Sequence, residues 1–154
     1  MLLSQYKNIV RLVLLFIMCL SSHAFAAKEC AIIGDSLAKA VGRQSVCHVY
    51  DYPDLPGVVI ARLTPPGLYL DKAVILMGND EPYTTPTSSI ARVRNKILKG
   101  SVLWVLPLEN DNLRNFIKTT AEYRNEPYLD LRKYTEGDKI QIQRLSDQIN
   151  KWTR

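Results

Sequence analysis

The sequence is poor in the residues that most often bind metals and transfer protons, since its 154 residues include three cysteines and two histidines. Cys30 and Cys47 lack a third and fourth ligand nearby, so the sequence predicts no metal site, and it implies no organic cofactor. Blocks of Lys and Arg interleaved with aromatic residues are missing, which argues against nucleic-acid binding despite a formal net charge of +5. Internal repeats and low-complexity linkers are also missing, and the length suits a single domain.

A long membrane-spanning run is missing too, but the first 26 residues have the layout of a secretory signal peptide. Lys7 and Arg11 precede an uninterrupted apolar run, residues 12–20, and small residues follow it. That run is shorter than the roughly 20 residues that a bilayer span requires. We therefore expect cleavage after Ala26 and export to the periplasm or medium, with residues 27–154 as the folded domain. An uncleaved membrane anchor is the alternative.

Two cysteines remain after the expected cleavage, because Cys19 lies in the signal segment. Cys30 begins the first predicted strand and Cys47 lies near the start of the second. An even number of cysteines in an oxidising compartment favours a disulfide if those strands are neighbours. The alternative is a pair of small buried thiols.

Short apolar runs alternate with helical patterns along the rest of the chain. This rhythm predicts right-handed crossovers and a parallel sheet with helices on both faces. The expected fold is therefore three-layer α/β/α, with a flavodoxin-like, doubly wound sheet of about five strands in the order 2-1-3-4-5. The predicted strands are residues 30–34, 45–51, 72–78, 101–107 and 126–131. The predicted helices are residues 36–42, 58–63 and 86–100, one beginning near Asn110 or Asp111, and an amphipathic one at the C-terminus.

Two short motifs fall at the carboxyl ends of neighbouring predicted strands, where ligands bind in such folds. Gly34-Asp35-Ser36-Leu37 follows the first strand, and Gly78-Asn79-Asp80 follows the third. Ester hydrolysis needs a nucleophile and donors directed at the developing oxyanion. The Ser36 hydroxyl can attack, while the Ser36 backbone N–H, the Asn79 amide and the Gly57 backbone N–H can donate. A purely structural role is the alternative, in which Ser36 or Asp35 caps a helix.

These motifs resemble those of the SGNH (GDSL) hydrolases, a family of esterases, lipases, thioesterases and carbohydrate deacetylases with this fold. The resemblance extends over essentially all of residues 27–154. It implies that Ser36 is the nucleophile and Asn79 an oxyanion donor, and that Gly57 is the glycine of the second motif. The last family motif, D-x-x-H before the final helix, corresponds here to residues 138–141. The aspartate matches as Asp138, whereas Gln141 stands at the histidine position.

The missing histidine removes the usual general base. A carboxamide such as Gln141 cannot accept the serine proton near neutral pH. His48 is the only histidine of residues 27–154, and it lies inside the second strand, from where Ser36 is hard to reach. Asp80 is expected to shape its turn, which leaves Glu81 and Glu109 as candidates for a substitute base.

Asp138 has two compatible roles in this reading. It can serve as the catalytic acid of the family motif, or it can cap the final helix, because an acid followed three residues later by Gln141 is close to a capping box.

Two functions follow from these residues. The first is an exported serine ester hydrolase that acts on a small acyl or acetyl ester, or on an acylated saccharide or lipid. The second is a catalytically inactive binding module of the same fold, which holds an envelope saccharide or an acylated ligand.

Overall fold

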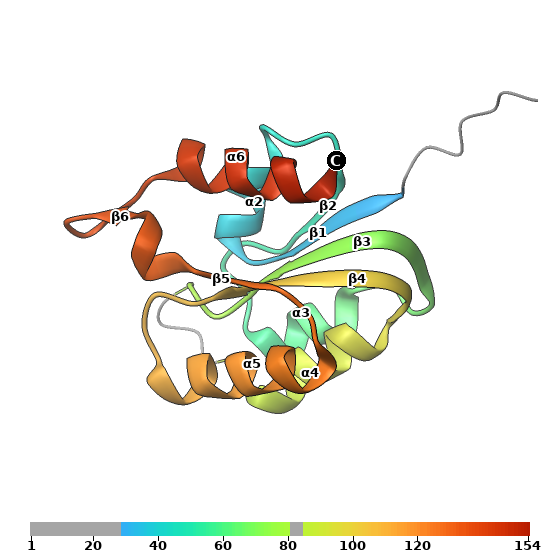
Figure 1. Ribbon diagram of the computed structural model, residues 1–154. Helices are drawn as coiled ribbons and strands as arrows, with labels where there is room; N and C mark the ends of the chain where they lie inside the picture. Colours follow the sequence, from blue (N-terminus) through green and yellow to red (C-terminus); the bar gives the residue numbers. More distant parts are fainter. Residues whose placement is uncertain (1–28, 81–84) are drawn as a thin grey trace, which may run out of the picture.

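The structure is a computed structural model that describes residues 29–80 and 85–154. Five parallel strands form one sheet in the order β2-β1-β3-β4-β5, so the predicted fold class and strand order are confirmed (Figure 1). The strands are β1 Cys30–Gly34, β2 His48–Asp51, β3 Leu68–Leu76, β4 Ile97–Leu106 and β5 Tyr128–Asp130. The expected signal peptide lies outside the described residues and stays a prediction.

Helices cover both faces of the sheet, which gives three layers (Figure 1). One face carries α2 (Ser36–Gly42) and α6 (Ile142–Thr153). The other carries α3 (Gly57–Leu63), α4 (Thr87–Asn95) and α5 (Asp111–Arg124). Alternate side chains of the central strands enter two separate hydrophobic cores, one on each face, as expected for a parallel sheet that is buried on both sides. Among the described residues, no helix is long and apolar enough to cross a bilayer.

Some predicted boundaries are wrong, among them the end of α4 and the start of β3. The spacing of Ile90, Val93 and Ile97 predicts a helix as far as Gly100, but α4 ends at Asn95 and β4 already begins at Ile97. The early part of β4 pairs with β3, which starts at Leu68 rather than at residue 72. Tertiary pairing thus overrides the helical spacing of the apolar residues.

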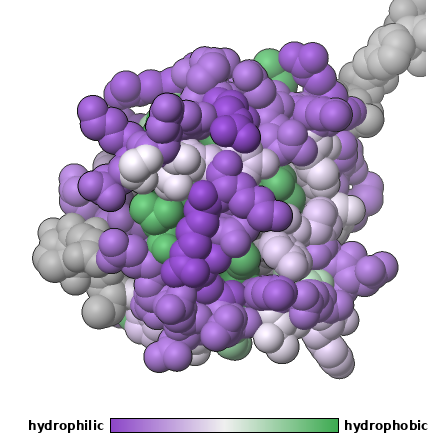
Figure 2. All heavy atoms as spheres, turned by 60° about the vertical axis from the view of Figure 1, so that its left-hand side comes forward, coloured by the Kyte–Doolittle hydropathy of each residue, from purple (hydrophilic) through white to green (hydrophobic). Residues whose placement is uncertain are grey.

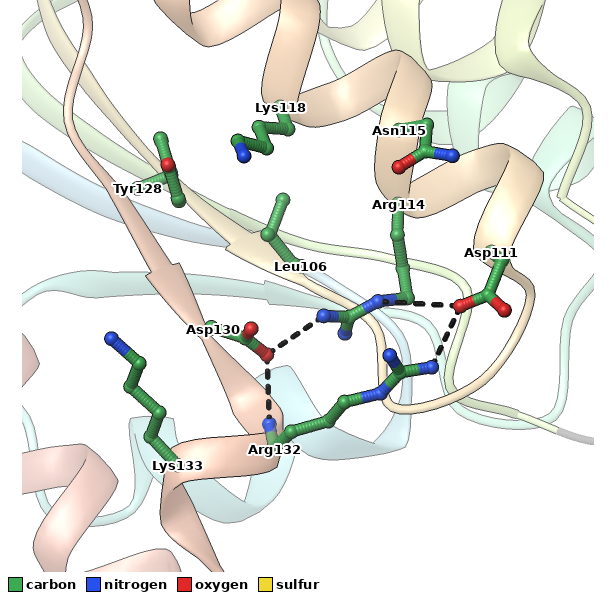
Figure 3. A pocket seen from close by; sticks show the side chains of 9 residues that line it. All are labelled: Leu106, Asp111, Arg114, Asn115, Lys118, Tyr128, Asp130, Arg132 and Lys133. Atoms are coloured by element: carbon green, nitrogen blue, oxygen red, sulfur yellow. Dashed lines mark hydrogen bonds and ion pairs between the residues drawn. The ribbon is translucent and has the colours of Figure 1, made fainter.

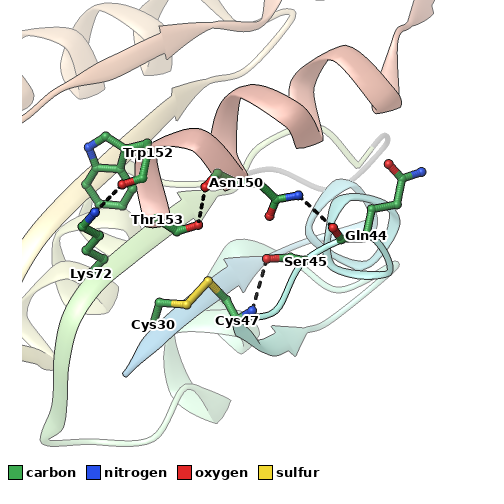
Figure 4. Close-up of a disulfide and its surroundings, with 8 residues drawn as sticks. All are labelled: Cys30, Gln44, Ser45, Cys47, Lys72, Asn150, Trp152 and Thr153. Atoms are coloured by element: carbon green, nitrogen blue, oxygen red, sulfur yellow. Dashed lines mark hydrogen bonds between the residues drawn. A yellow bond between two sulfur atoms is a disulfide. The ribbon is translucent and has the colours of Figure 1, made fainter. Parts of the chain in front are cut away.

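A disulfide joins Cys30 to Cys47, the pairing that the sequence favours, with the two Cα atoms 4.9 Å apart. It ties the start of β1 to the segment before β2 (Figure 4). A loop of this length contributes about 3 kcal/mol in the chain-entropy model of disulfide stabilisation. Nearby, the Asn150 amide donates to the carbonyl of Gln44 at 2.8 Å and holds α6 against the turn after α2.

The segment between β5 and α6 contains three short elements that the sequence patterns did not predict. A short 3₁₀ helix, η1 (Leu131–Tyr134), follows β5. A two-stranded antiparallel hairpin comes next, made of β6 (Thr135–Glu136) and β7 (Lys139–Ile140). The predicted last-motif residues therefore lie in and just after a hairpin that is separate from the main sheet.

Candidate functional site

The turn after β1 places Ser36 as the first residue of α2. Asp35 is the N-cap of this helix, because its Oδ1 accepts a hydrogen bond from the Leu37 backbone N–H at 3.1 Å. The capping role thus belongs to Asp35 rather than to Ser36. Gly34 permits β1 and β3 to approach closely, since a Cβ at this position would lie 1.6 Å from the Leu76 carbonyl oxygen of β3.

The turn after β3 is in contact with the turn after β1, as the strand order predicts. Asp35 Oδ2 accepts hydrogen bonds from the Asn79 backbone N–H at 2.8 Å and from the Asn79 side-chain amide at 3.4 Å. Gly78 adopts a positive φ of 96° here, a conformation that favours glycine. A buried carboxylate therefore joins the two motifs and positions Asn79 beside the turn after β1.

Asp80 contacts the candidate nucleophile directly. Its Oδ2 accepts a hydrogen bond from Ser36 Oγ at 2.9 Å. The same oxygen also accepts from the Ser36 backbone N–H at 3.1 Å and from the Asp54 backbone N–H at 2.9 Å. Asp80 was expected only to shape its turn, but its carboxylate also accepts a hydrogen bond from the Ser36 hydroxyl. Its position directly after Asn79, on a turn expected to face Ser36, is the sequence feature that indicates this contact.

Asp35 is the ionisable group of the site with the most perturbed titration. Its burial, with 1% of the residue exposed, raises its pKa to about 6, and the neighbouring charge of Asp80 adds to this rise. Hydrogen bonds from Asn79 and Leu37 oppose the shift by favouring the charged form. The Asp35 carboxyl group therefore exchanges its proton closer to neutral pH than an exposed aspartate does.

The Asn79 amide is oriented by the loop after β4. Its Oδ1 accepts from the Leu108 backbone N–H at 3.2 Å, which leaves the NH₂ group as the end able to donate to a ligand. Two arginines stabilise this loop by donating hydrogen bonds to its carbonyl groups. Arg114 donates to the Pro107 carbonyl, and Arg132 donates to the Leu108 carbonyl at 3.2 Å. An oxyanion donor at Asn79 would thus have a fixed support.

Gly57 is the first residue of α3, and its backbone is buried. A Cβ at this position would lie 2.6 Å from Thr85 Cγ2, so the neighbouring side chain requires glycine here. Within the described parts of the chain, no hydrogen bond joins Gly57 to Ser36 or Asn79. Its role as the third oxyanion donor stays a prediction.

Among the described residues, no hydrogen bond joins Ser36 to Asp138 or Gln141. Asp138 is exposed in the turn between β6 and β7, and Gln141 occupies the N-cap position of α6. The Gln141 amide donates to Glu136 Oε2 at 2.6 Å, and its oxygen accepts from Arg144 at 3.2 Å. The capping box expected from Asp138 is wrong, because α6 begins after Gln141 and has no side-chain cap. The triad-acid role of Asp138 stays a prediction.

The other candidate bases also lie away from Ser36 or outside the described residues. His48 is exposed on the edge strand β2, paired with Ala31 near the start of β1, and its ring packs edge-on against Tyr50 at 4.5 Å. Glu109 is exposed on the loop after β4, and Glu81 falls in the undescribed segment. Among described side chains, no cluster of three or more His, Cys, Asp or Glu could hold a metal ion.

The edge of the molecule that carries this site is mainly hydrophilic. Figure 2 looks onto the left-hand side of Figure 1, toward which the carboxyl end of β1 points, and shows small, separate apolar spots among polar side chains. A ligand at this edge would meet mostly polar groups.

Comparison with known proteins gives limited similarity. No protein-family model matches the chain, and no curated protein sequence matches it. Among solved structures, the chain is similar to a protein assigned to the G-D-S-L lipolytic family, from Desulfitobacterium hafniense DCB-2, with a TM-score of 0.43 and 19% identity over 73% of this chain and 83% of that one. Similarity at this level leaves the function to be argued from the site itself.

Proposed function

We propose that the protein is a serine ester hydrolase of the SGNH type, in which Ser36 is the nucleophile and Asp80 receives its proton. The observation that carries this proposal is the 2.9 Å hydrogen bond from Ser36 Oγ to Asp80 Oδ2. A nucleophile and a base in hydrogen-bond contact are the basic requirement for covalent acyl transfer. The position of Asn79 on the facing turn supports the proposal.

The proposed reaction proceeds in two steps. Asp80 accepts the hydroxyl proton while Ser36 Oγ forms a bond to the carbonyl carbon, and the Asn79 amide, with Gly57 as a further donor, stabilises the oxyanion. The ester C–O bond then breaks, and the proton on Asp80 passes to the departing alkoxide. Water then attacks the acyl carbon while Asp80 accepts a water proton. The bond from Ser36 Oγ to the acyl carbon breaks, the acid is released, and Asp80 returns the proton to Ser36 Oγ.

A carboxylate is a weaker base than imidazole toward a serine hydroxyl, so we expect slow turnover. Enzymes that have lost a triad member retain about 10³–10⁴-fold catalysis over water from the oxyanion hole and substrate binding. The proposed substrates are acyl or acetyl esters of small molecules, saccharides or lipids. Export to the periplasm or medium is part of the proposal, and the Cys30–Cys47 disulfide is compatible with it.

A binding module is the second candidate, because Asp80 Oδ2 engages both donors of Ser36. The Ser36 backbone N–H would have to release Asp80 before it could donate to a substrate oxyanion. In this alternative Asp80 stays in place as an internal anion, and a saccharide or acylated ligand binds beside it without turnover.

Hydrolysis of p-nitrophenyl acetate by the purified protein separates the two candidates. We expect Ser36→Ala to reduce the rate to background and Asp80→Asn to reduce it by about 10²-fold, within the range for loss of a general base. Gln141→Ala is the matched control and should retain the rate, because the Gln141 amide bonds Glu136 rather than Ser36. A wild-type rate equal to that of Ser36→Ala would remove the hydrolase proposal in favour of the binding module.

A histidine variant tests the predicted last motif separately. If Gln141→His gains Ser36-dependent hydrolysis, position 141 can reach the nucleophile, and Asp138 keeps its proposed role as triad acid. If no gain occurs, the correspondence of residues 138–141 with the family motif fails, while the Ser36–Asp80 pair is unaffected.

A further inference from the structure

A hollow lies at the same edge of the sheet as Ser36, beyond the loop that supports Asn79. It is a cleft of about 330 Å³ between α5 on one side and the chain from β5 to η1 on the other (Figure 3). Leu106, at the carboxyl end of β4, lies at its base and is 3% exposed. The volume is at the lower end of the range for small-molecule sites, which is sufficient for one ring-sized ligand.

The arginines of this cleft are already paired. Arg114, with 8% of its side chain exposed, donates to Asp130 Oδ1 at 2.9 Å. Arg132 donates to Asp111 Oδ1 at 2.7 Å. The buried Arg114–Asp130 pair and the exposed Arg132–Asp111 pair each cancel the charge of their arginine. The arginines therefore stabilise the walls of the cleft and leave no unpaired positive charge for a ligand.

Two lysines supply the remaining positive charge. Lys118 extends from α5 and Lys133 from η1, on opposite sides of the cleft (Figure 3). The acid nearest to Lys118 is Glu122, at 3.9 Å, and both side chains are half-exposed, so this pair is weak. No ion pair of Lys133 occurs among the described residues. An anionic group between the two ammonium groups would gain charge-assisted hydrogen bonds from both sides.

The remaining lining suits a sugar ring. Tyr128, with 36% of its surface exposed, presents an aromatic ring beside Leu106, and such surfaces pack against the C–H groups of a saccharide. Asn115 lies on the opposite wall, where its amide can both donate to and accept from hydroxyl groups.

We propose that this cleft binds an acidic saccharide, a sugar ring that carries a carboxylate or phosphate group. The anionic group would lie between Lys118 and Lys133, and the ring would pack on Tyr128. This inference rests on the proposed function in one respect, that the same saccharide carries its ester to Ser36. The strand order places the cleft two to three strands from β1, about 10–15 Å at the usual strand spacing, a distance that a short oligosaccharide spans.

Binding to the cleft is measured independently of hydrolysis, by NMR titration of the isotope-labelled full chain. The probes are trigalacturonate, glucose 6-phosphate, neutral maltotriose and inorganic phosphate. We expect at least one of the two acidic sugars to shift the backbone signals of Asn115, Tyr128 and Lys133 saturably, and maltotriose to leave them unchanged. Which acidic sugar binds more tightly identifies the anionic group as carboxylate or phosphate.

A charge-matched pair of double variants tests the lysines. Lys118→Gln/Lys133→Gln should weaken acidic-sugar binding by about tenfold or more, the loss of two charge-assisted contacts. Lys39→Gln/Lys151→Gln removes the same charge from exposed positions on α2 and α6, on the other face of the sheet, and should leave binding unchanged. The proposal is overturned if neither acidic sugar shifts the cleft signals, if the lysine variant binds as wild type does, or if inorganic phosphate binds as tightly as glucose 6-phosphate.

The two proposals can fail separately. Acidic-sugar binding without any Ser36-dependent hydrolysis would support the proposed saccharide site and contradict the hydrolase proposal. Hydrolysis of p-nitrophenyl acetate without acidic-sugar binding would support the hydrolase proposal and contradict the saccharide site.

Discussion

The two turns that follow β1 and β3 differ sharply from the hairpin that precedes α6, although all three segments carry motifs that resemble those of the SGNH hydrolases. In the turns, Asp35 is buried and joins Asn79 to the turn after β1, while Asp80 accepts a hydrogen bond from Ser36. In the hairpin, Asp138 is exposed and the Gln141 amide is occupied by Glu136. One half of the predicted site is a connected network, and the other half is a surface segment.

The contrast indicates which of the two regions can hold reacting groups in a fixed arrangement. A hydrogen-bond network that joins two neighbouring strand ends holds its groups in one geometry, which catalysis requires. An exposed side chain on a two-stranded hairpin has weaker support, because a hairpin of this size is only marginally stable alone. The proposed base is therefore sought in the turns, at Asp80, rather than in the hairpin.

The largest effect is expected from adding a methyl group at Gly34, the last residue of β1. Gly34→Ala would place a Cβ 1.6 Å from the Leu76 carbonyl oxygen, so the β1–β3 pairing must shift. We expect a loss of more than about 3 kcal/mol in unfolding free energy. Gly137→Ala is the matched variant in the hairpin, where nothing lies within 4 Å of the added Cβ and only the positive φ of 59° costs energy, about 1 kcal/mol. Urea unfolding compares the two, and equal losses would contradict the contrast between these regions.

The next largest effect is a change in the rate of ester hydrolysis when the side-chain amide of Asn79 or Gln141 is removed. Asn79→Ala should reduce the rate of ester hydrolysis by about 10²–10³-fold, the range for loss of one oxyanion donor. Gln141→Ala should change the rate by less than about twofold, because no hydrogen bond joins Gln141 to the site within the described residues. Steady-state hydrolysis of p-nitrophenyl acetate measures both. A larger loss at Gln141 than at Asn79 would move the functional site to the hairpin.

A smaller effect is expected from pH. The folded pKa of Asp35 is about 6, above its unfolded value of 3.8, so the native state binds the extra proton and this group's stabilising contribution is lost as pH rises. The loss between pH 4.5 and 7 is about 2 kcal/mol, with most of it below pH 6. Asp35→Asn should remove this slope in urea unfolding at the two pH values, whereas Asp138→Asn should leave it intact. A slope that survives in Asp35→Asn would show that Asp35 titrates normally.

Asp130 works in the opposite direction and at lower pH. Although burial raises its pKa, hydrogen bonds from Arg114 and the Arg132 backbone outweigh this and lower it. Its contribution to stability is present above the unfolded pKa and is lost as pH falls below about 4. The pH range from 4.5 to 7 therefore reports Asp35 with little interference from Asp130.

The smallest effect tests whether the support behind Asn79 matters. Arg132→Gln removes a donor to the Leu108 carbonyl and an ion pair with Asp111, and both side chains of that pair are more than half exposed. We expect less than about 1 kcal/mol of lost stability. The rate of ester hydrolysis should fall only a few-fold, because Leu108 still donates to Asn79. A loss as large as that of Asn79→Ala would make this loop, rather than the two turns, the main support of the site.

Much of the fold could be predicted from local patterns. Apolar runs that end in Gly34 and Gly78 marked two central strands, and the alternation with helices indicated the strand order that the structure has. The end of α4 was missed, because an apolar residue at position 97 fits a helix face and a strand equally well. Ile97 belongs to a strand because it pairs with Leu68 of β3, which is distant in the sequence.

Sequence patterns alone predict the class of fold, the favoured disulfide pairing, and the two motifs that the strand order brings face to face. These depend on periodicity and on residues adjacent in the chain, which a sequence displays directly. The sequence did not indicate which side chain caps α2, that Asp80 partners Ser36, or that the Gln141 amide bonds Glu136, and the folded structure shows each of these. Each of these depends on side-chain direction and on donors supplied by other segments, and a buried carboxylate must be satisfied by whichever donors folding brings to it.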